Sequence, residues 1–109
     1  PVGPFVRLHQ GIRTVDASQD RPIITLGREP SCDLVLEDAF ASRVHCRVER
    51  RADSIVLTDS STNGTCVRSD DGTEYLVKKK SMILSGKGLL FFGRAFDGER
   101  RGGVRYETY

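Results

Sequence analysis

Short β-prone segments recur along the whole chain, and this rhythm constrains the fold more than any other sequence feature. Runs of Val, Ile, Leu and Phe are separated by turn signals rich in Gly, Asn, Asp and Ser. Segment 44–48 alternates apolar and polar residues, which is the pattern of a half-buried strand. No stretch keeps a 3.6-residue apolar period over three turns. Strands at about 8–12-residue intervals are typical of a sandwich or a barrel, so the sequence predicts an all-β domain.

The predicted strands are all short. A first hairpin is expected to turn at 9–11, and Asn63-Gly64 is expected to form a tight turn, because both residues tolerate positive φ. Segment 97–103 predicts an excursion before the last strand. The strands are expected at 5–8, 12–15, 23–26, 34–36, 44–48, 55–57, 65–67, 75–77, 82–84, 89–92 and 104–109.

Length and charge narrow the class of protein. A chain of 109 residues fits one domain, so 1–109 is treated as a single unit. Because the chain starts Pro1-Val2-Gly3 rather than with Met, we interpret it as a fragment of a longer protein. A net charge of +2 argues against a nucleic-acid partner. No apolar run approaches the ~20 residues of a membrane helix, so no membrane partner is expected.

The cysteine pattern and the absence of known catalytic motifs argue against an enzyme. Cys32, Cys46 and Cys66 are odd in number and widely spaced, which predicts reduced thiols in a cytoplasmic protein. Cys46 alternates with Val44 and Val48, so it is predicted to lie in the core. No spacing fits a metal site or a P-loop, so neither metal nor cofactor is expected. Ser42, His45 and Asp59 could be imagined as a catalytic triad, but nothing in their spacing implies the geometry of a nucleophile and its base.

Three predicted loops carry side chains suited to an oxyanion. An arginine fork matches the geometry of a phosphate group, and hydroxyl groups with loop amides supply further donors. One such residue follows a predicted strand, two close the second loop, and two lie in the third. They are Arg28, Ser42, Arg43, Thr62 and Asn63.

The order and spacing of these loops resemble the forkhead-associated (FHA) domain family. The similarity extends over about residues 23–93. Each motif is weak alone, but three in order on a β-only background are specific. The matching segments are G-R at 27–28, S-C-D-L-V-L at 31–36, S-R-V-H at 42–45, D-S-S-T-N-G-T at 59–65 and L-F-F-G at 90–93.

This resemblance implies an eleven-stranded β-sandwich whose loops at one end bind phosphothreonine. Arg28 would contact the phosphopeptide, and Ser42 would donate its hydroxyl to a phosphate oxygen. Arg43 would add positive charge. Asn63 would hydrogen-bond the peptide backbone, and Thr62 would add a contact to phosphate or main chain. The partner would be a phosphothreonine-containing protein, or a phosphorylated segment of the same protein.

The family pattern also implies structural residues at the site. Gly27, His45 and Gly64 would shape the loops, with the histidine bracing them rather than touching ligand. Acidic side chains near the loops would oppose phosphate binding: Glu29, Glu37 and Asp38.

Two other functions are compatible with the sequence. A phosphate-independent scaffold or oligomerisation domain, regulating a linked enzyme domain, would use segment 75–80 or an exposed strand at 104–109. Nucleic-acid binding would use Arg47, Arg50, Arg51 and 78–80, but charge runs are usually solvated and no aromatic residues interleave with them. Segments 49–51, 57–59 and 104–109 resemble FHA domains of bacterial nucleotide-cyclase-type signalling proteins, so a linked cyclase would lie outside this chain.

Overall fold

The computed structural model describes residues 4–37, 41–92 and 103–109. These residues form eleven strands, and each coincides with a β-prone run of the sequence. None of these residues forms a helix long and apolar enough to cross a membrane. The strands are β1 (Val6–Gln10), β2 (Arg13–Ala17), β3 (Ile23–Gly27), β4 (Leu34–Val35), β5 (Cys46–Arg50), β6 (Ile55–Asp59), β7 (Thr65–Ser69), β8 (Glu74–Val77), β9 (Ser81–Leu84), β10 (Lys87–Phe92) and β11 (Val104–Thr108).

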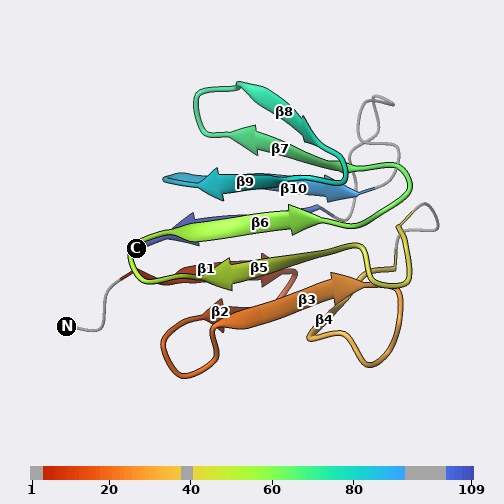
Figure 1. Cartoon of the computed structure of the whole chain (residues 1–109), viewed down its shortest axis with the longest axis horizontal. Helices are drawn as coiled ribbons and strands as arrows, with labels where there is room; N and C mark the ends of the chain where they lie inside the picture. The colour runs from red at the N-terminus through yellow and green to blue at the C-terminus, as the bar shows by residue number, and fades with distance from the viewer. Residues whose placement is uncertain (1–3, 38–40, 93–102) are drawn as a thin grey trace.

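The strands are arranged in two sheets (Figure 1). The six-stranded sheet has the order β2-β1-β11-β10-β7-β8, and the five-stranded sheet has the order β4-β3-β5-β6-β9. All pairings are antiparallel except that of β3 with β4. The prediction of an all-β, eleven-stranded sandwich is confirmed.

The core lies between the two sheets and is built from alternate residues of each strand, because successive side chains point to opposite faces. Burial of this apolar surface is the main favourable term in folding. The largest fully buried apolar side chains include Leu8, Leu90 and Tyr106 from the six-stranded sheet and Ile24, Leu26 and Leu57 from the five-stranded sheet.

Two local predictions are wrong at strand ends. Strand β5 begins at Cys46 rather than at position 44, and the Val44 side chain is 46% exposed. Cys46 and Val48 are buried as expected. The first hairpin turns at Gly11–Ile12, where Gly11 has a φ of 59°, and β1 continues to Gln10. A residue that tolerates positive φ sets the turn, so the glycine overrides the preceding polar residues.

The last strand is not an exposed one, contrary to prediction. β11 pairs with β1 on one side and with β10 on the other, so it has no free edge. Val104 and Tyr106 are buried. In contrast, β8 is an edge strand, and Tyr75 and Leu76 on it are 45% and 44% exposed. The predicted excursion at 97–103 lies outside the described residues except for its last position.

Candidate functional site

The strand register brings the three predicted loops to one end of the sandwich. Leu26 of β3 pairs with Cys46 of β5, and Cys46 pairs with Asp59 of β6. Residues that follow β3, precede β5 and follow β6 therefore leave the sheet from the same row. We call this end the loop rim, and it lies on the right in Figure 1.

The loop after β3 is hydrogen-bonded to the segment that carries Ser42. The backbone N–H of Arg28 donates to the carbonyl of Ser42 at 3.1 Å, and that of Glu29 donates to the carbonyl of Arg43 at 3.0 Å. The Arg28 and Arg43 side chains are exposed, and neither makes a hydrogen bond or ion pair with another described residue. Both guanidinium groups therefore remain available to an anion.

A second anchor fixes the far side of this loop. The Thr25 backbone N–H and hydroxyl donate to Asp33 Oδ2 at 2.8 and 3.0 Å, and Arg21 contacts Oδ1. The Thr25 backbone donor, chiefly, lowers the pKa of Asp33. Asp33 thus ties the loop that carries Arg28 back to β3 in its charged form.

Gly27 is required because another backbone crosses it. A Cβ at this position would lie 2.1 Å from the carbonyl oxygen of Arg43, and these are main-chain atoms that cannot rotate away. We expect Gly27→Ala to destabilise the domain by about 3 kcal/mol, the upper range for overpacking, and to separate Arg28 from Ser42. Urea unfolding checks the prediction.

Gly11→Ala is the matched control for Gly27→Ala, because nothing lies within 4 Å of a Cβ at Gly11. Its positive φ gives an expected cost of about 1 kcal/mol. Equal unfolding midpoints for the two variants would contradict the predicted steric requirement at Gly27.

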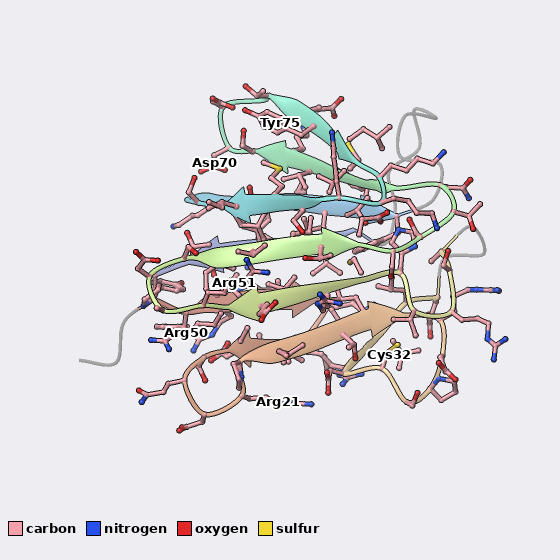
Figure 2. All side chains as sticks on the ribbon, in the orientation of Figure 1. Arg21, Cys32, Arg50, Arg51, Asp70 and Tyr75 are labelled. Atoms are coloured by element: carbon pink, nitrogen blue, oxygen red, sulfur yellow. The ribbon has the colours of Figure 1, made fainter. Side chains whose placement is uncertain are left out.

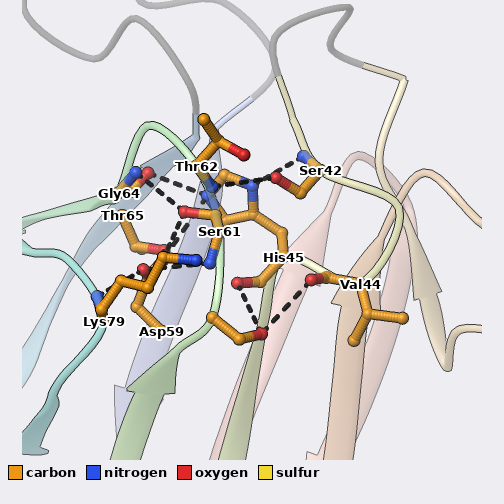
Figure 3. Close-up of polar contacts among 10 residues, drawn as sticks. Ser42, Val44, His45, Asp59, Ser61, Thr62, Gly64, Thr65 and Lys79 are labelled. Atoms are coloured by element: carbon orange, nitrogen blue, oxygen red, sulfur yellow. Dashed lines mark hydrogen bonds and ion pairs between the residues drawn. The ribbon is translucent and has the colours of Figure 1, made fainter.

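His45 joins two of the loops from a fully buried position (Figure 3). Its Nδ1 accepts the backbone N–H of Ser42 at 3.0 Å, and its Nε2 donates to the carbonyl of Gly64 at 2.8 Å. Since an N–H can only donate and a carbonyl can only accept, the imidazole is the neutral Nε2–H tautomer. The ring also packs edge-on against Phe92, with centroids 5.2 Å apart.

The Ser42 hydroxyl lies at the junction of the second and third loops. Its oxygen accepts the backbone N–H of Thr62 at 3.2 Å. Among the described residues it has no acceptor for its own hydrogen, so the hydroxyl can still donate to a ligand. The His45 nitrogens are both occupied by backbone groups, so this serine lacks the base that a hydrolytic nucleophile needs.

Asp59 organises the third loop from inside the sandwich. Its side chain is fully buried and accepts four hydrogen bonds. Oδ1 receives the hydroxyls of Ser61 and Thr65 at 2.7 and 2.8 Å, and Oδ2 receives the backbone N–H groups of Ser61 and Lys79 at 3.1 and 2.9 Å. Sequence reasoning missed the roles of Ser61 and Lys79.

The Asn63-Gly64 turn connects the two sheets rather than forming a hairpin. β6 belongs to the five-stranded sheet and β7 to the six-stranded sheet. Gly64 has a φ of 93°, and its N–H donates to the hydroxyl of Ser61 at 2.8 Å. The turn leaves Thr62 and Asn63 exposed on the loop rim.

The hydrogen bonds therefore link the segments that carry all five predicted binding residues. The Arg28 backbone bonds the Ser42 carbonyl, the Ser42 hydroxyl bonds the Thr62 backbone, and His45 connects Ser42 to the residue after Asn63. These bonds are all short and local to the loop rim. At the rim, Arg28, Arg43, Thr62 and Asn63 are exposed and Ser42 is half-buried.

The cysteines and the pocket considered as other candidate sites are buried or lie away from the loop rim. Cys32, Cys46 and Cys66 are buried and form no disulfide, and burial raises the pKa of Cys32 and of Cys46. The described residues contain no group of three metal-ligating side chains. A shallow pocket of about 500 Å³ has Asp70 and Lys87 in its lining. Asp70 lies at the end of the sandwich away from the loop rim (Figure 2).

The basic residues considered for nucleic acid do not form one surface. Arg50 and Arg51 lie toward the end of the sandwich away from the loop rim (Figure 2). Arg50 donates to the carbonyl of Pro4 at 3.1 Å, and Arg51 lies 3.5 Å from Glu49. The run 78–80 lies at the loop rim, so the length of the strands separates it from Arg50 and Arg51. Arg47 lies in β5, 3.9 Å from Glu49.

Two β-sheets with these strand orders, with polar loops gathered at one end, define a β-sandwich of the FHA type. The FHA domain family matches this sequence over residues 24–86, which is more than half of the chain. The chain therefore belongs to the FHA domain family. No curated protein sequence matches it significantly.

Solved structures share the fold at low sequence identity. The FHA-1 domain of Mycobacterium tuberculosis Rv1747 is 15% identical, with a TM-score of 0.70 and 97% of both chains covered. The N-terminal FHA domain of S. cerevisiae Rad53p, in complex with a phosphothreonine peptide, is 24% identical, with a TM-score of 0.69 over 95% of this chain and 91% of that one. The FhaA FHA domain, complexed with the intracellular domain of Rv3910, is 19% identical, with a TM-score of 0.62 over 98% and 100%.

Proposed function

We propose that this FHA domain is a non-catalytic module that binds phosphothreonine peptides through the loop rim. The observation that carries the proposal is the hydrogen-bonded link between the Arg28, Ser42 and Asn63 segments. Arg28 and Ser42 would bind phosphate, Arg43 would add charge, and Thr62 and Asn63 would contact the phosphate or the peptide backbone. Structures of the same fold that hold phosphothreonine peptides support this assignment.

The charge and rigidity of the loop rim suit a dianion. A phosphate monoester carries roughly −1.5 to −2 charges near neutral pH. Hydrogen bonds to charged groups contribute about 1.5–3 kcal/mol each, so two or three can separate phosphorylated from bare peptide. Because loop amides and His45 already fix the backbone that carries these donors, the ordering cost on the protein falls mainly on the arginine side chains. Association and peptide ordering subtract from the gain, which favours reversible, micromolar-class binding.

The test is a calorimetric titration with one threonine peptide in phosphorylated and unphosphorylated forms. We expect binding of the phosphorylated form only. Arg28→Ala and Ser42→Ala should each weaken it by about tenfold or more, since each removes a donor to a charged group. Equal affinity for the two peptides, or full binding by Arg28→Ala, would overturn the proposal.

Arg51→Ala is the matched control for Arg28→Ala. Arg51 is an exposed arginine at the opposite end of the sandwich, where it pairs only with Glu49 among the described residues. Its removal lowers net charge by the same amount but leaves the loop rim intact. Its phosphopeptide affinity should match that of the unmodified domain at physiological salt.

The wider context is part of the same proposal. The domain would act in cytoplasmic, bacterial signalling as part of a longer protein, and any linked catalytic activity, such as a nucleotide cyclase, would belong to another domain. The bound segment would come from a separate protein or from the same chain. Co-purification of phosphoproteins on the domain, compared with Ser42→Ala, tests this wider role.

A further inference from the structure

Carboxylates are unevenly distributed over the loop rim, with mixed charge beside β3 and positive charge beside β9. On the side of β3 it bears Glu29 and Glu37, and Leu36 fixes the latter because its N–H donates to the Gly27 carbonyl at 2.7 Å. On the side of β9 it bears three consecutive lysines, Lys78, Lys79 and Lys80, all exposed. Among the described residues these lysines make no ion pair.

The three-lysine turn is held against the third binding loop. Thr65 at the start of β7 pairs with Val77 at the end of β8, so the residues outside this pair are also neighbours. A Cβ at Gly64 would lie 3.3 Å from Cβ of Lys78. The first lysine therefore lies directly beside the turn that presents Asn63.

The lysine turn is also fixed from below. The Lys79 backbone N–H donates to the buried carboxylate of Asp59 at 2.9 Å, and the Asp59 N–H donates to the carbonyl of Lys80 at 2.9 Å. Lys79 adopts a φ of 56°, a conformation that costs an L-residue free energy. The hydrogen bonds to buried Asp59 compensate for this cost. The three lysine side chains therefore extend from a backbone of defined position.

We propose that Lys78, Lys79 and Lys80 form a second contact surface for the phosphopeptide and select partners that carry acidic residues on one flank of the phosphothreonine. The inference rests on the proposed function of the loop rim. Beside β3, a peptide seated between Arg28 and Asn63 meets the carboxylates of Glu29 and Glu37 together with the arginines, and beside β9 it meets only lysines. One peptide direction therefore places its acidic flank on the lysines, and the reverse direction places it against Glu29 and Glu37.

The expected gain in affinity is modest because the three lysine side chains are exposed. Ion pairs between exposed side chains are individually weak and are screened by salt. Two or three such pairs give about a fivefold gain in affinity at low ionic strength. Repulsion from the carboxylates on the other side adds to the difference between the two flanks.

The experiment compares three phosphothreonine peptides of equal length, with neutral flanks, with three aspartates before the phosphothreonine, or with three after it. Binding is measured to the unmodified domain and to a Lys78→Gln, Lys80→Gln double variant. We expect the peptide with one of the two acidic flanks to bind about fivefold more tightly than the neutral peptide at low ionic strength, and this gain to be largely lost in the double variant and in 0.5 M salt. The neutral peptide should bind both proteins equally.

Lys87→Gln is the control, because Lys87 is an exposed lysine at the other end of the sandwich, 3.8 Å from Glu107. It should retain the full flank preference. Equal affinity for both acidic peptides, or a gain over the neutral peptide that survives undiminished in the double variant, overturns the inference while the neutral phosphopeptide still binds. Failure of the neutral phosphopeptide to bind overturns the proposed function instead. Displacement of the acidic peptide by an unrelated oligonucleotide at equal affinity would make the lysines a general polyanion surface and also overturn the inference.

Discussion

Replacing His45 by alanine is expected to destabilise the domain by about 3 kcal/mol or more and to abolish phosphopeptide binding. The side chain is fully buried and packs against Phe92, so its loss leaves a cavity. It also leaves the Ser42 N–H and the Gly64 carbonyl without their partner. A buried polar group without a hydrogen bond costs about 1–3 kcal/mol. Urea unfolding and calorimetric titration on the same sample measure both effects.

Two conservative variants separate the contributions of the ring nitrogens. In His45→Asn the amide oxygen can replace Nδ1 as acceptor for Ser42, whereas in His45→Gln the amide nitrogen can replace Nε2 as donor to Gly64. We expect both to be more stable than His45→Ala. We expect His45→Asn to retain more phosphopeptide affinity, because it keeps the segment that carries the Ser42 hydroxyl in place.

The matched control is the other histidine of the chain. His9 lies in β1, partly exposed, and contacts Glu107 at 2.6 Å. An ion pair of this kind is worth at most about 1 kcal/mol, so His9→Ala should have a small effect on unfolding and none on phosphopeptide affinity. Comparable losses in the two alanine variants would contradict a bracing role for His45.

The strands could be predicted from the sequence because each needs only a short apolar run and a turn signal. Segments at 23–26 and 55–57 are continuous β-branched and leucine runs, and both became strands of the five-stranded sheet. Partner choice is a different matter, since pairing depends on contacts far apart in the chain. The sequence predicts an exposed strand at 104–109, yet β11 inserts between β1 and β10.

The loop geometry shows a similar limit. Val44 continues the alternation of β5 by sequence, but the chain at 42–45 crosses above Gly27 instead of extending the sheet. Asn63-Gly64 signals a turn correctly, yet the signal cannot say that the strands it joins belong to different sheets.

The order of the motifs pointed to exposed residues of the rim, such as Arg28 and Asn63, and to the buried residues Gly27, His45 and Gly64. The support beneath them was not visible in the sequence. Lys79 contributes through its backbone N–H, which every non-proline residue possesses, so no residue-type signal marks it. The signal that could have revealed Ser61 is its spacing from Asp59, because a serine two residues after an aspartate often returns a bond to it.

Asp59→Ala is expected to lower the free energy of unfolding by about 3–5 kcal/mol, because it leaves several buried donors unsatisfied and each such group costs about 1–3 kcal/mol. The substitution leaves two backbone N–H groups and two hydroxyls without their common acceptor. Because a domain of this size is stable by about 5–15 kcal/mol, the variant should be marginally folded at 25 °C. Urea unfolding followed by far-UV circular dichroism measures the change.

Asp59→Asn is the conservative variant to compare with Asp59→Ala, and Asp53→Ala is the control at an exposed aspartate. The asparagine amide can face the hydroxyls of Ser61 and Thr65, which can accept as well as donate, while its oxygen still receives the backbone N–H groups. Asp59→Asn should therefore lose less stability than Asp59→Ala. Asp53 lies exposed between β5 and β6, and its alanine variant should stay within about 0.5 kcal/mol of the unmodified domain.

The same variants test how far the carboxylate controls the loop rim. Asp59 fixes the third loop through Ser61 and the lysine turn through Lys79, so both should loosen together when it is removed. Amide hydrogen exchange of the Ser61 and Lys79 N–H groups should accelerate in Asp59→Ala well before global unfolding. Unchanged exchange at both positions would show that the β6–β7 loop and the β8–β9 turn are held by other contacts, and that Asp59 has no organising role at the rim.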